Sequence, residues 1–297
     1  MMWASYYDLH SHSTQSDGEH AIEHVASMMS SQGVTTWALT DHDTISGWSE
    51  AYSAAQKFGI RLIPGIEITC AVGLPANDNE LQRLERLRAS SSWHLLAYFP
   101  PDVFEKPHVI HSLEQWLMPL KQGRLPRMES MIKRLSEMGM EIDINDVRSK
   151  ASDSIGRPHL AQAMVDAGYV QTTREAFDTF IGDGGPAFVA RDEPPLEQTI
   201  AFIHELGGIT SLAHPLYYGV PVTELIQFLK DVKCDAVEAF HRSHDDEYRF
   251  TLWEEAKRNN LKVTVGSDFH GTSYGQMPGN MAVIIDDLPE LILQSKM

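Results

Sequence analysis

The chain has 297 residues, of which 42% are hydrophobic and 22% are charged. These values exclude a mini-protein, a fibrous protein and an intrinsically disordered chain, and they allow one large catalytic domain or a core with an inserted subdomain. The formal net charge of -17 repels a polyphosphate backbone. We therefore expect no extended duplex nucleic acid as a partner, and a nucleic-acid substrate should be short.

The cysteine pattern and the apolar stretches indicate the compartment. Cys70 and Cys234 form no C-x-x-C pattern, so the sequence predicts neither a disulfide framework nor a thiolate zinc site. Residues 1–10 lack the basic and apolar regions of a signal peptide, and the longest stretch without Asp, Glu, Lys or Arg, 206–223, contains His214 and two prolines. We expect a cytoplasmic protein that enters no membrane, and the sequence leaves its oligomeric state open.

In chain order, short apolar runs alternate with amphipathic stretches over most of the sequence. The apolar runs, which predict strands, are residues 6–9, 35–39, 61–68, 94–99, 209–213, 236–240, 261–265 and 281–285. The amphipathic stretches, which predict helices, are residues 19–31, 44–58, 196–206, 222–232 and 245–259. This alternation is typical of repeated βα units and predicts an α/β fold.

The alternation stops between the fourth and fifth predicted strands. There the sequence predicts successive helices over residues 113–138, 144–151, 159–167 and 174–181. Paired prolines at 100–101 and 194–195 bracket this segment, as expected where a chain leaves and re-enters a scaffold. We predict a core formed by residues 1–103 and 195–297, and an inserted helical lid formed by residues 104–194.

Histidines and acidic residues recur directly after the predicted strands, where βα scaffolds present functional groups. His10 and His12 are two residues apart, so their side chains share one face of an extended strand end and suit one metal ion. A chance surface pair is the alternative for this H-x-H pattern. His42 follows the second strand between two aspartates, of which Asp43 is also explained as a helix cap.

Three more strands carry such groups. Glu67 lies inside the apolar third strand, where an ionised and unpaired acid costs several kcal/mol, so it requires a partner. That partner is either a metal ion or a salt bridge. The ends of the fifth and seventh strands provide His214, Asp268 and His270, and the last two again share one face.

Together these positions form a set of six imidazoles and three carboxylates without a thiolate: His10, His12, His42, His94, His214, His270, Asp17, Glu67 and Asp268. Such nitrogen and oxygen ligands suit zinc, manganese or iron. The set exceeds what one ion coordinates and predicts two or three divalent ions, manganese first, with zinc, iron(II) or magnesium as alternatives. Such a site would be positively charged and attract phosphate.

Seven ordered motifs resemble those of the PHP (polymerase and histidinol phosphatase) family of metal-dependent phosphoesterases. They are DLHSHS, SDG, TDHD, PGIEI, GRPH, AHP and GSDFH, and the resemblance runs from about residue 6 to about residue 286. It implies a distorted seven-stranded (β/α) barrel whose mouth holds a multinuclear metal centre that hydrolyses phosphate esters. The inserted helices, the AHP step and the last motif most resemble the stand-alone enzymes that act on nucleoside 3',5'-bisphosphates and on 5' ends of short RNA.

The resemblance also implies roles for individual residues. It implies three metal positions, held by His10, His12, Glu67 and Asp268, by Glu67, His94 and His214, and by Asp17, His42 and His270. Asp17, Glu67 and Asp268 are the implied catalytic carboxylates. The GRPH segment implies phosphate binding by Arg157 and His159, because a guanidinium grips phosphate through two parallel hydrogen bonds. A solvated arginine at a helix start is the alternative for Arg157.

This chain departs from the bisphosphatase and exoribonuclease group between Glu67 and His94, where residues 74–92 predict an extra surface loop or short helix. His94 therefore has a core histidine as its alternative. The Tyr217–Tyr218 pair predicts either base stacking or simple packing. Candidate donors of the proton for the leaving oxygen are His241, His244 and a water molecule.

The expected mechanism is in-line attack on phosphorus by a metal-activated hydroxide, which needs no protein nucleophile. Walker A, G-x-G-x-x-G and G-x-S-x-G motifs are absent from the sequence, which excludes the NTPase and dehydrogenase readings. Three alternatives stay open at this point. They are a phosphatase of another small or cyclic phosphate ester, such as histidinol phosphate or a sugar phosphate, a non-catalytic metal-binding regulatory module, and a deaminase or amide hydrolase.

Overall fold

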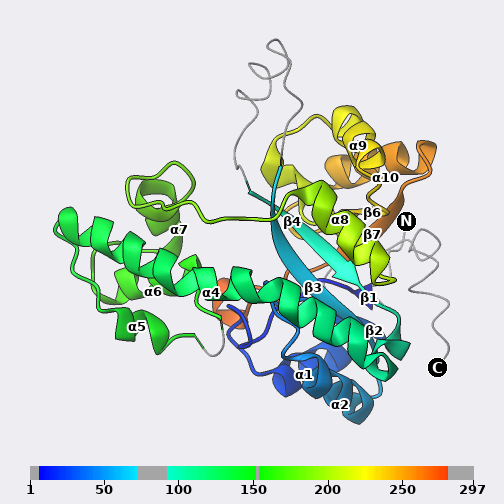
Figure 1. Ribbon diagram of the computed structural model, residues 1–297, viewed down its shortest axis with the longest axis horizontal. Helices are drawn as coiled ribbons and strands as arrows, with labels where there is room; N and C mark the ends of the chain where they lie inside the picture. The colour runs from blue at the N-terminus through cyan, green and yellow to red at the C-terminus, as the bar shows by residue number, and fades with distance from the viewer. Residues whose placement is uncertain (1–6, 73–91, 152–153, 280–297) are drawn as a thin grey trace.

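The computed structural model describes residues 7–72, 92–151 and 154–279, and its strands form a single curved sheet in the order β1 to β7 (Figure 1). The strands are β1 (Tyr7–Asp8), β2 (Thr36–Leu39), β3 (Arg61–Ala71), β4 (Ser92–Tyr98), β5 (Ile209–Leu212), β6 (Ala236–His241) and β7 (Lys262–Gly266). The first and last strands also meet, because the backbone N–H of Leu9 donates to the carbonyl of Val265 at 2.9 Å. The predicted α/β class and the distorted seven-stranded barrel are confirmed. The strand predicted at 281–285 and nearly all of the 74–92 segment lie outside the described residues.

One strand runs against the others. β1 to β3 are parallel to one another, as are β5 to β7, whereas β4 is antiparallel to both β3 and β5. The first residues of β4 therefore lie at the end of the barrel where the other strands finish. His94 is consequently paired with Thr69, two residues beyond Glu67, and this reversal departs from the expected run of βα units.

Amphipathic helices cover the outside of the barrel. They are α1 (Ile22–Ser31), α2 (Trp48–Phe58), α8 (Leu196–Glu205), α9 (Val222–Asp231) and α10 (Asp246–Arg258). On α1, the fully buried Val25 and Met29 are four residues apart, which places both on the face against the barrel. Each such side chain contributes roughly 1.5–3 kcal/mol by leaving water. All five helices were predicted, although α1 and α2 begin a few residues later than expected.

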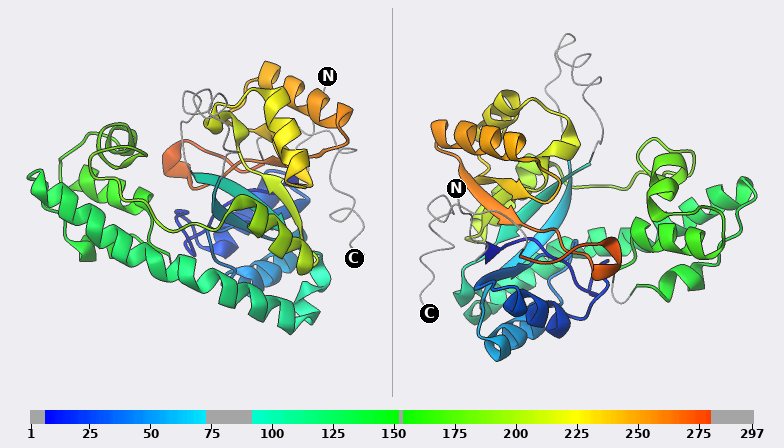
Figure 2. Two further views of the ribbon diagram at one scale, coloured as in Figure 1. Left: turned by 45° about the horizontal axis from the view of Figure 1, so that its top comes forward. Right: turned by 180° about the vertical axis from the view of Figure 1, so that it is seen from behind.

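The segment between β4 and β5 forms the predicted additional helices, which project from one side of the barrel (Figure 2). They are α4 (Pro107–Glu137), α5 (Ile144–Arg148), α6 (Arg157–Asp166), α7 (Thr173–Ala176) and a π-helix (Phe177–Ile181). Short 3₁₀ helices cover Pro101–Glu105, Pro215–Tyr218 and Thr272–Tyr274.

Helix α4 belongs to two hydrophobic clusters. Leu113 and Leu117 pack in the barrel cluster, whereas Met131 and Leu135 pack in a separate cluster with α5 and α6. A separate cluster is what an inserted subdomain requires. The division into residues 1–103 with 195–297 and residues 104–194 stays a prediction, because the change of cluster falls within α4 itself.

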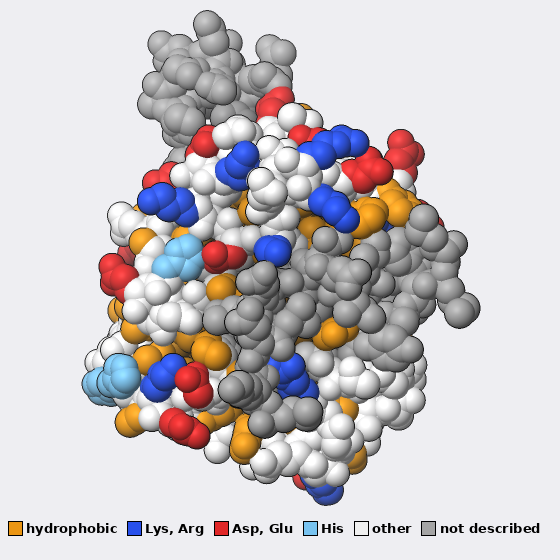
Figure 3. Space-filling model, turned by 90° about the vertical axis from the view of Figure 1, so that its right-hand side faces the viewer, with side chains coloured by type: hydrophobic (Ala, Val, Ile, Leu, Met, Phe, Trp, Pro, Cys, Tyr) orange, Lys and Arg blue, Asp and Glu red, His pale blue; other side chains and the backbone are white. Residues whose placement is uncertain are grey.

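Two further observations concern the surface and the helices of the described residues. On the side of the barrel away from the additional helices, acidic and basic side chains are interspersed (Figure 3). Within the described ranges, no helix combines the length and the apolar character that a bilayer crossing requires.

Candidate metal centre

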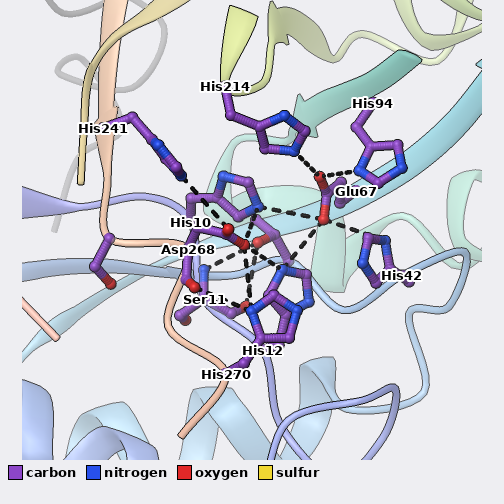
Figure 4. A network of polar contacts seen from close by, with 12 residues as sticks. His10, Ser11, His12, His42, Glu67, His94, His214, His241, Asp268 and His270 are labelled. Atoms are coloured by element: carbon purple, nitrogen blue, oxygen red, sulfur yellow. Dashed lines mark hydrogen bonds and ion pairs between the residues drawn. The ribbon is translucent and has the colours of Figure 1, made fainter. Parts of the chain in front are cut away.

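The residues expected at the strand ends do meet at one end of the barrel (Figure 4). His10 and His12 follow β1, and the loop after them is fixed by Asp41, which accepts hydrogen bonds from the backbone N–H and the hydroxyl of Ser13. His214 follows β5. Asp268 and His270 follow β7, and the parallel bridge between Ser11 and Phe269 keeps the first and last segments together. The close contact of these segments therefore follows from barrel closure.

Backbone strain accompanies two of these positions and Asp43, which follows β2. Asp43, His214 and Asp268 have φ angles of 54°, 29° and 51°. Residues with a Cβ atom rarely adopt such angles, and they concentrate at functional sites, where the surrounding structure enforces them.

Glu67 is the centre of the cluster and contacts five imidazole rings. Its Oε2 atom lies 3.2 Å from His10 Nε2, 3.1 Å from His12 Nε2 and 3.1 Å from His42 Nδ1. Its Oε1 atom lies 2.8 Å from His94 Nδ1 and 3.1 Å from His214 Nε2. The partner expected for Glu67 was either a metal ion or a salt bridge, and within the described residues its carboxylate faces imidazoles, which can bind a metal ion or pair with the acid when protonated.

Two aspartates complete the cluster. Asp268 Oδ1 lies 3.4 Å from His10 Nε2 and 3.3 Å from His12 Nε2. Asp17 Oδ1 lies 3.4 Å from His270 Nε2, and Asp17 Oδ2 lies 3.8 Å from His42 Nε2.

The donor set fits divalent metal ions. His10 Nε2, His12 Nε2, His42 Nδ1 and Glu67 Oε2 are buried and make no hydrogen bond of normal geometry within the described chain. Buried polar atoms are rarely left in this state. The spacings of 3.1–3.2 Å between these nitrogens and Glu67 Oε2 are about those of neighbouring ligands around one ion, since metal–ligand bonds measure roughly 2.0–2.2 Å.

Among the described residues, three groups can be formed in which the ligand atoms all lie within 4.8 Å of one another: His10, His12, Glu67 and Asp268; His12, Asp17, His42 and His270; and His42, Glu67 and His94. The first group is one of the sets implied by the family resemblance, and the second is the implied set Asp17, His42 and His270 with His12 added. In the third group His42 takes the place expected for His214, although His214 also contacts Glu67. The assignment of individual residues to metal ions stays a prediction.

Burial and the mixture of carboxylates and imidazoles shift the pKa values of this cluster in both directions. Burial alone would lower the pKa of His12, but the carboxylates of Asp268 and Glu67 beside its ring raise it to about 10. Burial would raise the pKa of Glu67, yet the surrounding histidines hold it well below its usual value. By contrast, burial lowers the pKa of His42 to about 3. Divalent ions can supply the positive charge in place of protons on the imidazoles.

A buried acid that sequence reasoning missed supports two of the histidines. Glu238, on β6, accepts a hydrogen bond from His10 Nδ1 at 3.0 Å and another from the backbone N–H of His214 at 2.7 Å. Gly266 makes room for this contact, since a Cβ atom there would lie 2.2 Å from His10 Cβ and 2.5 Å from Glu238 Oε1. An acid inside a predicted apolar strand was the available signal.

A cavity of about 280 Å³ connects the cluster with the additional helices. From the barrel it is lined by Asp17, His42, Glu67, His94, His214, Asp268 and His270. From the opposite side it is lined by Arg124, Arg127, Arg157 and Arg191. Of these arginines only Arg157 was singled out from the sequence. Arg124 and Arg127 lie three residues apart on α4, a spacing that places both on one helix face and was the available signal for this pair.

The GRPH segment forms the start of α6. Arg157 lines the cavity, and its Nη1 atom lies 2.6 Å from Asp183 Oδ1. His159 is buried, and its Nδ1 atom accepts a hydrogen bond from the backbone N–H of Gly156 at 3.0 Å. His159 therefore supports the helix start and is not among the residues that line the cavity, and its substrate-binding role stays a prediction.

Asp43 is bound to two of the arginines. Its Oδ2 atom accepts hydrogen bonds from Arg124 and, at 2.9 Å, from Arg191. Burial would raise the pKa of Asp43, but the charges of Arg191 and Arg124 lower it below its usual range. The alternative explanation of Asp43 as a helix cap is wrong, because the residue preceding α2 is Gly47.

Of the remaining candidate residues, two tyrosines and two histidines, some pack in the interior and others lie at the cavity or the cluster. Tyr218 is buried, stacks on Trp93 and accepts a hydrogen bond from the backbone N–H of His94, whereas Tyr217 is exposed and lines the cavity. His241 Nε2 lies 3.4 Å from Asp268 Oδ2. His244 is buried outside the cavity.

Similarity to known proteins agrees with this site. The chain matches the PHP domain over residues 8–276. A 5'-3' exoribonuclease of Haemophilus influenzae is 31% identical, with 89% of each chain covered. A 3',5'-nucleoside bisphosphate phosphatase of Chromobacterium violaceum is 28% identical, covering 96% of this chain and 93% of that protein. A phosphoribosyl 1,2-cyclic phosphate 1,2-diphosphodiesterase of Eggerthella lenta is 28% identical, covering 91% of this chain and 96% of that protein.

A solved structure agrees as well. A protein of Bifidobacterium adolescentis described as a metal-dependent phosphoesterase superposes with a TM-score of 0.80 and 27% identity, covering 98% of this chain and 96% of that one. The resemblance seen in the motifs is thereby confirmed. The chain belongs to the PHP domain family and is a metal-dependent phosphoesterase.

Proposed function

We propose that this phosphoesterase removes a phosphate from nucleoside 3',5'-bisphosphates or nucleotides from the 5' ends of short RNA. The observation that carries the proposal is the cavity in which four arginines face the carboxylate and imidazole cluster. A substrate with two phosphate groups can place one at each wall. A simple monoester would use only the wall formed by the cluster.

The arginine wall is suited to an anion. Burial, and then the charges of Arg157 and Arg191, lower the pKa of Arg127 to about 10. Arg127 donates from Nε to the carbonyl of Val189 at 2.7 Å, a neutral partner that leaves its charge uncompensated by that bond. A phosphate oxygen would compensate it, and guanidinium groups bind phosphate with two parallel hydrogen bonds.

The cluster is suited to the scissile phosphate. We assign the metal ions to His10, His12, His42, His94, His214, His270, Asp17, Glu67 and Asp268, with two or three divalent ions and manganese first. Bound there, the ions would lower the pKa of a water molecule and offset the charge of the phosphate. The protein contributes fixed ligands, of which Glu67 is central because its two oxygen atoms face different histidines.

His241 is the better placed of the two histidines considered as proton donors. Its Nδ1 atom is bound to the hydroxyl of Ser243 at 2.7 Å, and its Nε2 atom faces Asp268. His244 instead directs Nδ1 to the carbonyl of Ala239 at 3.0 Å. We therefore infer that His241, rather than His244, is the histidine that orients Asp268 and the groups beside it.

Hydrolysis of a panel of substrates tests the function, measured as inorganic phosphate for the monoesters and the bisphosphate, and by chromatography of the nucleotide or ring-opened product for the RNA and the cyclic phosphate. The panel contains adenosine 3',5'-bisphosphate, a 5'-phosphorylated RNA trimer, AMP, histidinol phosphate and phosphoribosyl 1,2-cyclic phosphate, each with and without added manganese. We expect the first two to be hydrolysed with the highest kcat/KM. Preference for the cyclic phosphate would instead favour the activity for which the Eggerthella relative is named.

A pair of variants tests the arginine wall directly. Arg127→Gln should lower kcat/KM for the bisphosphate by about 10–100-fold, the range for losing a charged hydrogen-bond partner. Arg258→Gln is the matched control, since Arg258 lies on α10 and pairs with Glu254 and Glu255 outside the cavity. Equal activity of both variants would contradict a phosphate site at this wall.

A further inference from the structure

Three distant segments meet on one carboxylate at the edge of the cavity. Asp43 follows β2, Arg124 belongs to α4, and Arg191 lies on the segment that returns from the additional helices to α8. Both guanidinium groups donate to the same atom, Asp43 Oδ2. The side chain of Asp43 is 1% exposed, and those of Arg124 and Arg191 are 11% and 7% exposed. This is a buried ionic contact, of a kind that fixes groups in one arrangement.

Asp43 is itself fixed to the strand that carries Glu67. Its backbone N–H donates to the carbonyl of Glu67 at 2.9 Å, and its Oδ1 atom accepts a hydrogen bond from the backbone N–H of Thr69 at 3.1 Å. Asp43 therefore connects the strand that carries Glu67, through these two hydrogen bonds, with the two arginines of the opposite wall.

Opposite charge holds the arginine pair in place. Asp43 lies between the two guanidinium groups, and Glu193 supplies a second carboxylate to Arg191. Arg191 also pairs with Glu193 at 3.3 Å, and Arg124 donates to the carbonyl of Ile155 at 3.3 Å. Without Asp43, two neighbouring cations in a buried place would repel one another and move apart.

We propose that Asp43 is a positioning residue that sets the separation between the two phosphate sites of the cavity, and thereby makes the enzyme selective for substrates carrying two phosphate groups. This inference rests on the proposed function. Asp43 acts through Arg124 and Arg191. It needs no contact with the substrate.

Selectivity is the quantity to measure. We define it as kcat/KM for adenosine 3',5'-bisphosphate divided by kcat/KM for p-nitrophenyl phosphate. Asp43→Asn keeps the size of the side chain and an oxygen acceptor for Thr69, but it removes the charge that holds the arginines. We expect selectivity to fall by at least about tenfold, as for other losses of a charged hydrogen-bond partner. Asp166→Asn, at an exposed carboxylate paired with Lys150, is the matched control and should keep the parental selectivity.

A second background separates positioning from general damage. In a chain that already carries Arg124→Gln and Arg191→Gln, adding Asp43→Asn should change selectivity by less than about twofold, because coupled residues do not act additively. An equal fall in both backgrounds would overturn the proposal. If Asp43→Asn does not fold, Asp43→Glu serves instead, since it keeps the charge but displaces it by one methylene. Parental selectivity in Asp43→Glu would then overturn the proposal.

The two proposals fail differently. A parent enzyme without preference for the bisphosphate overturns both the proposed function and the role of Asp43. A parent enzyme with that preference, which Asp43→Asn retains, overturns only the role of Asp43. Hydrogen exchange gives an independent readout, because exchange of the amides of residues 188–193 should accelerate in Asp43→Asn and not in Asp166→Asn.

Discussion

Glu238 Oε1 lies 3.0 Å from His10 Nδ1, on one edge of an imidazole whose other nitrogen, Nε2, lies 3.2 Å from Glu67 Oε2. A carboxylate accepts and does not donate, so this contact places the proton of a neutral His10 on Nδ1. The Nε2 lone pair is then directed toward Glu67. Carboxylates in this position orient metal-binding histidines and increase their basicity.

Glu238→Gln should therefore weaken metal binding without removing a ligand. The amide can donate to Nδ1 and so stabilise the wrong tautomer of His10. We expect the affinity for manganese to fall by about 10–100-fold, measured by titration calorimetry of the metal-free protein. Glu247→Gln, at an exposed position on α10, is the control. Unchanged manganese affinity in Glu238→Gln would show that the contact is only structural.

Glu67→Gln should have a larger effect. The substitution keeps the shape of the side chain, but it removes the negative charge that faces five imidazoles. We expect phosphoesterase activity to fall by at least about a thousandfold, and elemental analysis to find fewer metal ions per chain than the two or more expected for the parent. Glu50→Gln, on the exposed face of α2, is the matched control. Near-normal turnover of Glu67→Gln would reduce Glu67 to a structural acid.

Arg157 gives a prediction about substrate binding alone. Arg157→Ala should lower kcat/KM for the bisphosphate by about 10–100-fold while leaving the metal content unchanged. Arg157→Lys should recover only part of the loss, because an ammonium group keeps the charge but not the planar fork. If both variants match the parent, Arg157 serves only the packing of the additional helices, through contacts such as the one with Asp183.

The fold and the barrel side of the cavity were predictable because both depend on local patterns. Periodicity identified the strands and helices, and residues at the ends of parallel strands must meet. The same reasoning that selected Glu67, an acid within an apolar strand, applies to Glu238 in β6. Glu238 lies outside the seven motifs that carry the PHP resemblance.

The arginine wall was not predictable in the same way. Arg191 is 148 residues from Asp43 in sequence, and no periodicity relates them. Their contact depends on how the additional helices pack against the barrel. The reversal of β4 was missed for a related reason, since an apolar run predicts a strand but does not specify its direction.

The last prediction concerns stability at acid pH and His244. Burial lowers the pKa of His244 from 6.5 to about 4 in the folded protein. The unfolded chain binds a proton at this residue below about pH 6.5, whereas the folded chain resists it until about pH 4. The contribution of the neutral, buried His244 to the free energy of unfolding is therefore complete above pH 6.5 and is lost as the pH falls toward 4. At pH 5 the loss is on the order of 2 kcal/mol, because each pH unit in this window contributes up to about 1.4 kcal/mol.

Urea unfolding of the metal-free protein at pH 7.5 and pH 5 measures this effect, since removing the metal beforehand eliminates acid release of ions as a cause. His244→Gln keeps a donor for the carbonyl of Ala239, the partner of Nδ1, but it cannot titrate. The parent should lose about 2 kcal/mol more than this variant between the two pH values. His24→Gln, on the exposed face of α1, should follow the parent. Equal losses in the parent and in His244→Gln would mean that the buried ring takes up its proton without opposing folding, and the acid sensitivity would then have to come from the carboxylates of the cluster.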